Sequence, residues 1–198
     1  RSSAKGSRSY KRAACYGGMN YENNVIKFEN PHEMLLVCDD NLLDGHLSLH
    51  PWQDKILREF AEPSTSDEPY KAVVRAANGS GKDNFIVAPC AVWLSLRYEN
   101  CLTVITSASG NQLDRQTDKY IKQLTNAQNK IFGTQIWKQN YRRYENLING
   151  STIEMFVTDE AGRAEGWHPP VPGGQMAILV SEAKSIHDDI FTALARCT

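Results

Sequence analysis

The chain has 198 residues, of which 41% are hydrophobic and 23% charged, and this composition is typical of one globular domain of ordinary size. Its 22 Lys and Arg residues face 23 Asp and Glu residues, and the net charge of −1 excludes a uniformly basic nucleic-acid coat. No apolar stretch is long enough to cross a bilayer, and the five scattered cysteines indicate neither a disulfide framework nor a zinc site.

The sequence predicts a basic tail and lead-in segment over residues 1–47, followed by a domain over residues 48–198. Residues 1–12 hold five positive charges and no acid. Such a segment is either a solvated tail or an arm that binds DNA or a partner. Residues 61–69 are predicted to be an exposed acidic loop.

Strands and helices alternate from residue 70 onward. Residues 71–75 and 101–106 are predicted as buried strands, and residues 82–98 as a helix that Pro89 kinks or interrupts. The inner face of the next helix is predicted to carry Leu113, Thr117, Tyr120, Ile121 and Leu124.

The second half of the chain continues this alternation. The dipeptide Asn149-Gly150 predicts a β-hairpin around residues 144–157, because both turn residues tolerate a positive φ. An apolar strand at 176–180 and a helix near 188–196 follow a loop rich in Gly and Pro. The whole pattern predicts an α/β fold with a mainly parallel central sheet and helices on both faces.

A glycine-rich turn between a predicted strand and a predicted helix indicates a phosphate-binding loop, or P-loop. Residues 75–83 read Arg-Ala-Ala-Asn-Gly-Ser-Gly-Lys-Asp. Backbone N–H groups of such a turn point at phosphate oxygens, and its lysine reaches the β and γ phosphates. The formal pattern fails at Ala76 and Asp83, so a flexible turn with a surface lysine is the alternative. The predicted nucleotide-binding residues of the loop are Ala77, Asn78, Gly79, Ser80, Gly81, Lys82 and Asp83.

An apolar strand that ends in an acid supports the P-loop interpretation. Residues 176–182 read Met-Ala-Ile-Leu-Val-Ser-Glu, which has the form of a Walker B strand with Ser181 where Asp is usual. Glu182 is the candidate catalytic base at the carboxyl end of this strand, where nucleotide sites of parallel sheets lie. A salt-bridged acid at a strand end is the alternative interpretation of Glu182.

The two departures from the usual motifs are complementary. A carboxylate follows the lysine at Asp83, and a hydroxyl stands on the strand at Ser181. Our hypothesis is that Asp83 and Ser181 together hold Mg²⁺, directly or through water. The alternative is a degenerate site that binds nucleotide poorly or not at all.

Taken together, these residues resemble the ATPase domain of a tailed-bacteriophage terminase large subunit, the motor that packages viral DNA. The stretches that are similar to the family are residues 50–57 (His-Pro-Trp-Gln-Asp-Lys-Ile-Leu), the P-loop 75–82, residues 103–113, the loop 162–168 and residues 178–191. The resemblance implies a P-loop NTPase fold of the ASCE class. It implies that Gln53 recognises adenine, Arg75 senses the γ-phosphate, and Arg163 acts as an arginine finger toward a neighbouring subunit.

The resemblance also implies what the protein does and with what. The expected activity is Mg²⁺-dependent ATP hydrolysis that drives double-stranded DNA into a procapsid, in the host cytoplasm at the portal. Expected partners are duplex DNA, the portal protein, the small terminase subunit and further copies in a ring, with no membrane. The family's nuclease domain is not expected within these residues. A helicase-like translocase and a nucleotide-binding module with an inactive site remain as rivals.

One further stretch is a candidate for gripping DNA. Between residues 111 and 143 there are two acids and seven bases, which are Arg115, Lys119, Lys122, Lys130, Lys138, Arg142 and Arg143. This excess indicates either a solvated helix face or a surface that binds phosphates without regard to sequence.

Overall fold

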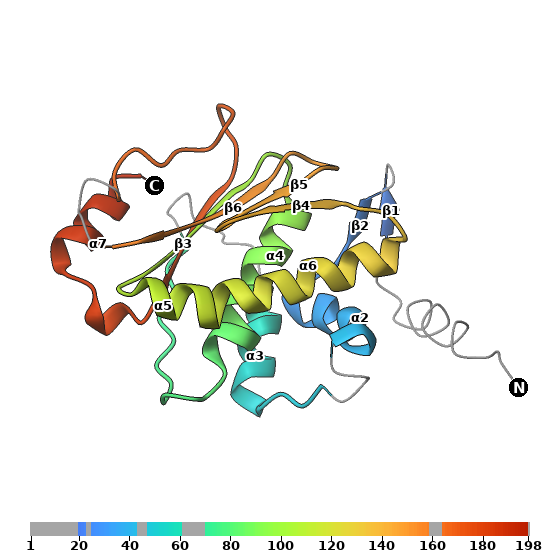
Figure 1. The fold of residues 1–198 in the computed structure, drawn as a ribbon, viewed down its shortest axis with the longest axis horizontal. Coiled ribbons are helices and arrows are strands. Elements are labelled where there is room, and N and C mark those ends of the chain that lie inside the picture. Colours follow the sequence, from blue (N-terminus) through green and yellow to red (C-terminus); the bar gives the residue numbers. More distant parts are fainter. Residues whose placement is uncertain (1–19, 23–24, 43–46, 61–69, 159–163, 198) are drawn as a thin grey trace, which may run out of the picture.

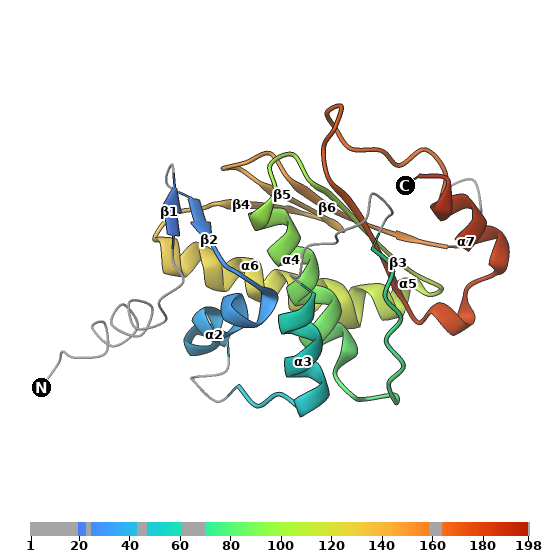
Figure 2. The ribbon, with the colours of Figure 1, turned by 180° about the vertical axis from the view of Figure 1, so that it is seen from behind.

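A computed structural model of the chain describes residues 20–22, 25–42, 47–60, 70–158 and 164–197. In chain order its elements are β1 (Asn20–Glu22), β2 (Val25–Lys27), α2 (Pro31–Leu42), α3 (Pro51–Glu59), the π-helix η1 (Asp83–Val87), α4 (Ala88–Arg97), β3 (Leu102–Ser107), α5 (Gly110–Gln112), the π-helix η2 (Leu113–Asp118), α6 (Lys119–Phe132), β4 (Trp137–Asn140), β5 (Arg143–Asn146), β6 (Thr152–Val157), β7 (Met176–Ser181), the 3₁₀-helix η4 (Ala183–Ser185) and α7 (Asp188–Ala195). Figures 1 and 2 show α7 at the end of the molecule away from β1 and β2.

A five-stranded sheet with the order β4-β5-β6-β3-β7 forms the centre of the molecule. β3 pairs in parallel with β6 and β7, whereas β5 pairs antiparallel with β4 and β6. The predicted α/β class with flanking helices is therefore confirmed, but the sheet is mixed rather than mainly parallel. Connection length explains the difference, because the links 141–142 and 147–151 are too short for a crossover and make hairpins.

The hairpin predicted around residues 144–157 is present as β5 and β6. In its loop Gly150 has a φ of 74°, and a Cβ there would lie 2.7 Å from Asn100 Oδ1. The Asn149 amide donates a hydrogen bond of 3.0 Å to the Ser95 carbonyl near the end of α4. The Asn-Gly turn therefore also satisfies backbone oxygen at a helix end.

The two faces of the sheet are covered by different helices. In β7, Leu179 packs against the main core, which includes buried residues of α2, α4 and α6. Its neighbours Ile178 and Val180 pack against the smaller cluster formed by α7. All six residues of β3 are buried, because this central strand has neighbours on both sides and helices on both faces.

Two expectations for the region around the glycine-rich loop need correction. Residues 71–75 do not form a strand, and Val73 is 90% exposed. In the described sheet β7 is an edge strand that pairs only with β3, so residues 71–75 share no ladder of hydrogen bonds with it. The helix predicted over 82–98 begins as η1 and continues as α4, and the expected interruption at Pro89 coincides with this change.

The N-terminal elements belong to the same core as the rest. Within α2, Met34, Leu35 and Cys38 are buried in the main cluster, although the sequence placed them in a lead-in segment. Trp93 of α4 donates a hydrogen bond of 3.0 Å to the Phe28 carbonyl. In the described part of the chain, no helix has both the length and the apolarity that a bilayer crossing requires.

Candidate functional site

The glycine-rich loop leads directly into the helix formed by η1 and α4. Gly79 and Gly81 have φ values of 73° and 77°, a left-handed conformation that side chains other than glycine disfavour. A Cβ on Gly81 would lie 2.8 Å from the Phe85 ring. The Phe85 N–H already bonds the Gly81 carbonyl at 2.8 Å, so helical hydrogen bonding begins immediately after the loop. The loop therefore ends at a helix N-terminus, where free N–H groups attract anions.

Gln53 ties the loop to α3. Its Oε1 accepts a hydrogen bond of 2.8 Å from the His50 N–H, which caps α3, and its Nε2 donates one of 2.8 Å to the Ser80 carbonyl. Gln53 is 1% exposed, so it is not a helix-surface residue. An adenine edge would have to replace one of these two bonds, and adenine recognition by Gln53 stays a prediction.

Lys82 and Glu182 form an ion pair across the carboxyl edge of the sheet. Lys82 Nζ lies 3.1 Å from Glu182 Oε1, and the side chains are 19% and 13% exposed. Glu182 follows β7 directly and has a φ of 54°. A non-glycine residue in this left-handed conformation stores backbone strain of about 1–3 kcal/mol, which is common at functional sites. The acid at the strand end is therefore salt-bridged, and its nearer partner is the lysine of the loop, while Lys184 Nζ lies 4.0 Å from Glu182 Oε2.

Asp83 is the centre of a small buried hydrogen-bond cluster. Its Oδ1 accepts a bond of 2.7 Å from Ser181 Oγ and another of 3.0 Å from Thr117 Oγ1. Asp83 is 8% and Thr117 1% exposed. The structure therefore joins the two candidate metal ligands and adds Thr117, which the sequence did not single out. The sequence signal that could have identified Thr117 as a site residue is its hydroxyl on the otherwise apolar inner face of the predicted helix.

The oxygen donors of this cluster suit Mg²⁺ in kind. A carboxylate and a hydroxyl are hard ligands, and Mg²⁺ is usually held by one or two protein oxygens together with phosphate oxygens and water. Among the residues that the structure describes, no group of three His, Cys, Asp or Glu side chains converges on a metal position. Asp83 and Ser181 would thus hold the ion only in company with a bound nucleotide.

The remaining predicted site residues lie apart from this cluster. Arg75 is exposed on the segment before the loop and pairs with no acid among the described residues. Ala77, Asn78 and Gly79 are exposed, as a loop that receives a ligand from solvent requires. Arg163 lies outside the described residues, so its role as an arginine finger stays a prediction.

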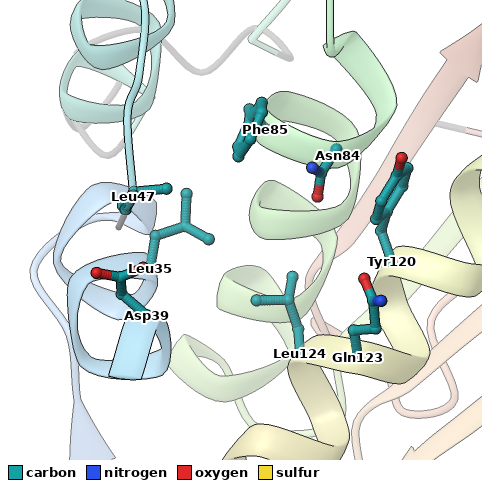
Figure 3. Close-up of a pocket in the computed structure, with 8 residues that line it drawn as sticks. All are labelled: Leu35, Asp39, Leu47, Asn84, Phe85, Tyr120, Gln123 and Leu124. Atoms are coloured by element: carbon teal, nitrogen blue, oxygen red, sulfur yellow. The ribbon is translucent and has the colours of Figure 1, made fainter. Parts of the chain in front are cut away.

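A cavity of about 160 Å³ adjoins the first turn of the helix. Figure 3 shows its walls, which come from α2, the segment before α3, η1 and α6. The lining residues are Leu35, Asp39, Leu47, Asn84, Phe85, Tyr120, Gln123 and Leu124. η1 and α6 are therefore not packed tightly against each other along their whole length.

The basic stretch over 111–143 divides into exposed and engaged residues. Arg142 is engaged, since its Nε lies 2.7 Å from Asp114 Oδ1 and its Nη2 lies 3.0 Å from Asp114 Oδ2. This guanidinium holds the pKa of Asp114 below its usual value. Arg142 therefore does not offer its charge to phosphates as the sequence suggested. The exposed bases are Arg115, Lys119, Lys122, Lys130, Lys138 and Arg143. Of these, Lys138 pairs with Glu145 and Arg143 with Glu154.

Comparison of this chain with models of protein families, with characterised proteins and with solved structures finds no match. The functional interpretation therefore depends on the geometry of the site.

Proposed function

We propose that this chain is a Mg²⁺-dependent ATPase that works as the motor domain of a viral DNA-packaging terminase. The observation that carries the proposal is the pairing of Lys82, at the end of a glycine-rich loop, with Glu182 at the carboxyl end of β7. In a P-loop site the loop lysine binds the phosphates and an acid beside them orients the attacking water, so the two groups are expected at one edge of the sheet.

Each group has a definite task in the proposed reaction. The N–H groups of residues 77–82 bind the phosphates, and Lys82 exchanges Glu182 for the β and γ phosphate oxygens. The released Glu182 carboxylate then accepts a hydrogen bond from a water molecule and orients it in line with the γ-phosphate. Mg²⁺, when bound, neutralises charge on the phosphates. The water attacks the γ-phosphorus directly, so no covalent enzyme intermediate forms.

Asp83 makes the metal necessary in this mechanism. A carboxylate about 4 Å from one phosphate charge is repelled by about 4 kcal/mol at an effective dielectric constant of about 20. That repulsion corresponds to roughly a thousandfold loss of affinity. Ser181 and Thr117 donate to one oxygen of Asp83 and stabilise its negative charge. Asp83 and Ser181 would hold a divalent cation, whose positive charge would offset this repulsion.

The motor function adds partners that the site alone does not require. We infer that the exposed bases of the 111–143 stretch face duplex DNA, and that the portal protein and the small terminase subunit bind elsewhere on the chain. Copies of the chain act as a ring at the procapsid portal in the host cytoplasm. Arg163 and Arg75 are the candidates for stabilising γ-phosphate charge, in trans and in cis.

The second candidate function is a nucleotide-binding or structural module without turnover. Asp83 favours it, because a buried carboxylate beside a phosphate loop opposes ATP wherever no metal bridges the two. The discriminating quantity is turnover in saturating Mg²⁺. A helicase-like translocase has no feature of the described residues in its favour.

Isothermal titration with ATP and Mg²⁺ tests the proposal. The wild-type chain is expected to bind, and Lys82→Ala to bind roughly 10 to 100 times more weakly, since a hydrogen bond to a charged group contributes about 1.5–3 kcal/mol. Lys55→Ala, an exposed lysine on α3, is the matched control and should bind like wild type. Negligible heat with wild type, or equal affinity in Lys82→Ala, contradicts the proposal.

A further inference from the structure

The helix formed by η2 and α6 carries an unpaired basic face. Arg115, Lys119, Lys122 and Lys130 are exposed, and their spacing places them on one side of the helix. None of the four pairs with an acid among the described residues, and Lys119 Nζ rests 5.6 Å from the Tyr120 ring centroid. Such a row of free cations complements the evenly spaced phosphates of a duplex.

The opposite side of the same helical segment contacts the candidate nucleotide site. Thr117 lies between Arg115 and Lys119 in sequence, is 1% exposed and donates its hydroxyl proton to Asp83 at 3.0 Å. Asp83 is the first residue of η1 and follows Lys82 directly. One helical segment therefore presents cations to solvent and holds a loop carboxylate inside.

The β4–β5 hairpin fixes the beginning of this segment. At the hairpin tip, Arg142 has a φ of 55° and binds both oxygens of Asp114 as well as the Gly110 carbonyl. Tyr141 beside it is 77% exposed, with its hydroxyl 3.4 Å from Asp114 Oδ2. The hairpin tip therefore holds η2 through Asp114.

The segment that carries Thr117 has an irregular helical geometry. It is a π-helix between two α-helical stretches, and η1, which it contacts, is a second one. Short π segments in helices often occur at functional sites, and a change to α geometry shifts the segment relative to its neighbours. The cavity in Figure 3 lies next to this contact, because Asn84 and Phe85 of η1 and Tyr120 at the start of α6 line it.

We infer that Thr117 is a positioning residue that couples duplex DNA on the basic face to the nucleotide at the glycine-rich loop. This inference rests on the proposed function. Bound nucleotide repels the Asp83 carboxylate, and a shift of Asp83 strains its bond to Thr117, whose buried hydroxyl is unfavourable without a partner. η2 relaxes by moving Thr117, and the same movement displaces Arg115 and Lys119. DNA that holds those side chains in one arrangement thereby changes the affinity for nucleotide.

The test is the coupling between the two ligands, measured at one fixed salt concentration. The dissociation constant of a non-hydrolysable ATP analogue with Mg²⁺ is measured by titration with and without a random-sequence DNA duplex. In wild type the two values should differ by about fivefold or more, and the analogue should change the DNA affinity by the same factor. Thr117→Val should bring both factors close to one, and Thr117→Ser should restore them. Thr125→Val, another buried threonine of the helix with no contact to Asp83, should leave them unchanged.

The outcomes separate this inference from the function on which it rests. If wild type binds no nucleotide, the proposed function fails, and this inference fails with it. If nucleotide and DNA both bind but neither changes the affinity of the other, the coupling alone is refuted. Coupling that persists in Thr117→Val, or that is lost equally in Thr125→Val, shows that Thr117 is not the connection.

Discussion

The two ends of the parallel strands β3, β6 and β7 use polar side chains in opposite ways. At the amino end the groups are neutral and their partners are backbone. Ser151 Oγ accepts a bond of 2.9 Å from the Cys101 N–H and donates one of 2.6 Å to the Tyr98 carbonyl. At the carboxyl end charged groups join the network, since Lys82 pairs with Glu182 and Asp83 accepts a hydrogen bond from the Ser181 hydroxyl.

The difference separates stabilising groups from groups that can exchange partners. A neutral hydroxyl that is already hydrogen-bonded to buried backbone does not bind a ligand, and its hydrogen bonds stabilise the fold. A lysine and a carboxylate that satisfy each other can each be satisfied by a phosphate and a water molecule instead. Changes at the amino end should therefore reduce stability without affecting nucleotide chemistry, and changes at the carboxyl end should do the reverse.

The largest expected effect is that of Glu182→Gln on turnover. Without the carboxylate that orients water, kcat should fall by roughly 10²- to 10⁴-fold, the usual contribution of general acid–base catalysis. ATP affinity should be retained, because the amide no longer competes for Lys82. Steady-state phosphate release and titration measure the two quantities. The exposed acid Glu165, changed to Gln, is the control, and an equal loss there contradicts the assignment of Glu182.

Ser181→Ala removes the hydroxyl that donates a hydrogen bond to Asp83 and is a candidate ligand of Mg²⁺. Mg²⁺ required for half-maximal turnover should rise about tenfold or more, since outer-shell partners of metal ligands contribute roughly 10- to 100-fold. A Mg²⁺ titration of the ATPase rate measures the change, and Ser181→Thr should restore it. An unchanged Mg²⁺ requirement refutes participation of Ser181 in the metal site.

Ser151→Ala should act on stability alone. It leaves the buried Cys101 N–H without its acceptor, which lowers the free energy of unfolding by about 1–3 kcal/mol. Denaturant unfolding followed by circular dichroism measures the loss, and turnover per folded molecule should be that of wild type. The exposed Ser185, changed to Ala, is the control. A loss of turnover in the folded Ser151→Ala protein would contradict the claim that the amino end of the parallel strands affects stability only.

The smallest expected effect is the pH dependence from the pair of Asp114 and Arg142. Arg142 lowers the pKa of Asp114 in the folded protein. The stabilisation is therefore fully present above the unfolded value of about 3.9 and is lost as pH falls through the lower folded pKa. Asp114→Asn should lower the free energy of unfolding at neutral pH by about 0.5–1 kcal/mol, because the carboxylate is partly exposed.

The same variant should flatten the stability curve on the acid side. Unfolding measured between neutral pH and pH values below the folded pKa gives the comparison, with the exposed acid Glu99 changed to Gln as control. A curve for Asp114→Asn that is as steep as that of wild type shows that the pair is not the source of the pH dependence.

The sequence predicted those elements that a local pattern of residues determines. The buried apolar runs located β3 and β7, and Asn149-Gly150 located the hairpin. The proximity of Lys82 and Glu182 was predicted from two parallel strands that end at one edge of a sheet. Residues 71–75 form no strand, and the packing of η1 and α4 against β7 brings the two side chains together instead. The strand predicted over residues 71–75 is absent, because a strand needs a hydrogen-bonded neighbour as well as an apolar run. Thr117, the bonds of Gln53 and the pair of Arg142 with Asp114 depend on contacts between distant segments, and no local pattern encodes them.

The most direct test of the account is phosphate release from ATP by the wild-type chain as a function of Mg²⁺ concentration. The account predicts saturable turnover that depends on Mg²⁺ and disappears on chelation, because Asp83 and Ser181 hold the ion that the phosphates need. The double variant Asp83→Thr with Ser181→Asp places the metal-binding groups at their usual positions. Its Mg²⁺-dependent turnover should not exceed that of wild type. Wild type without Mg²⁺-dependent turnover, beside a double variant that has it, would contradict the account.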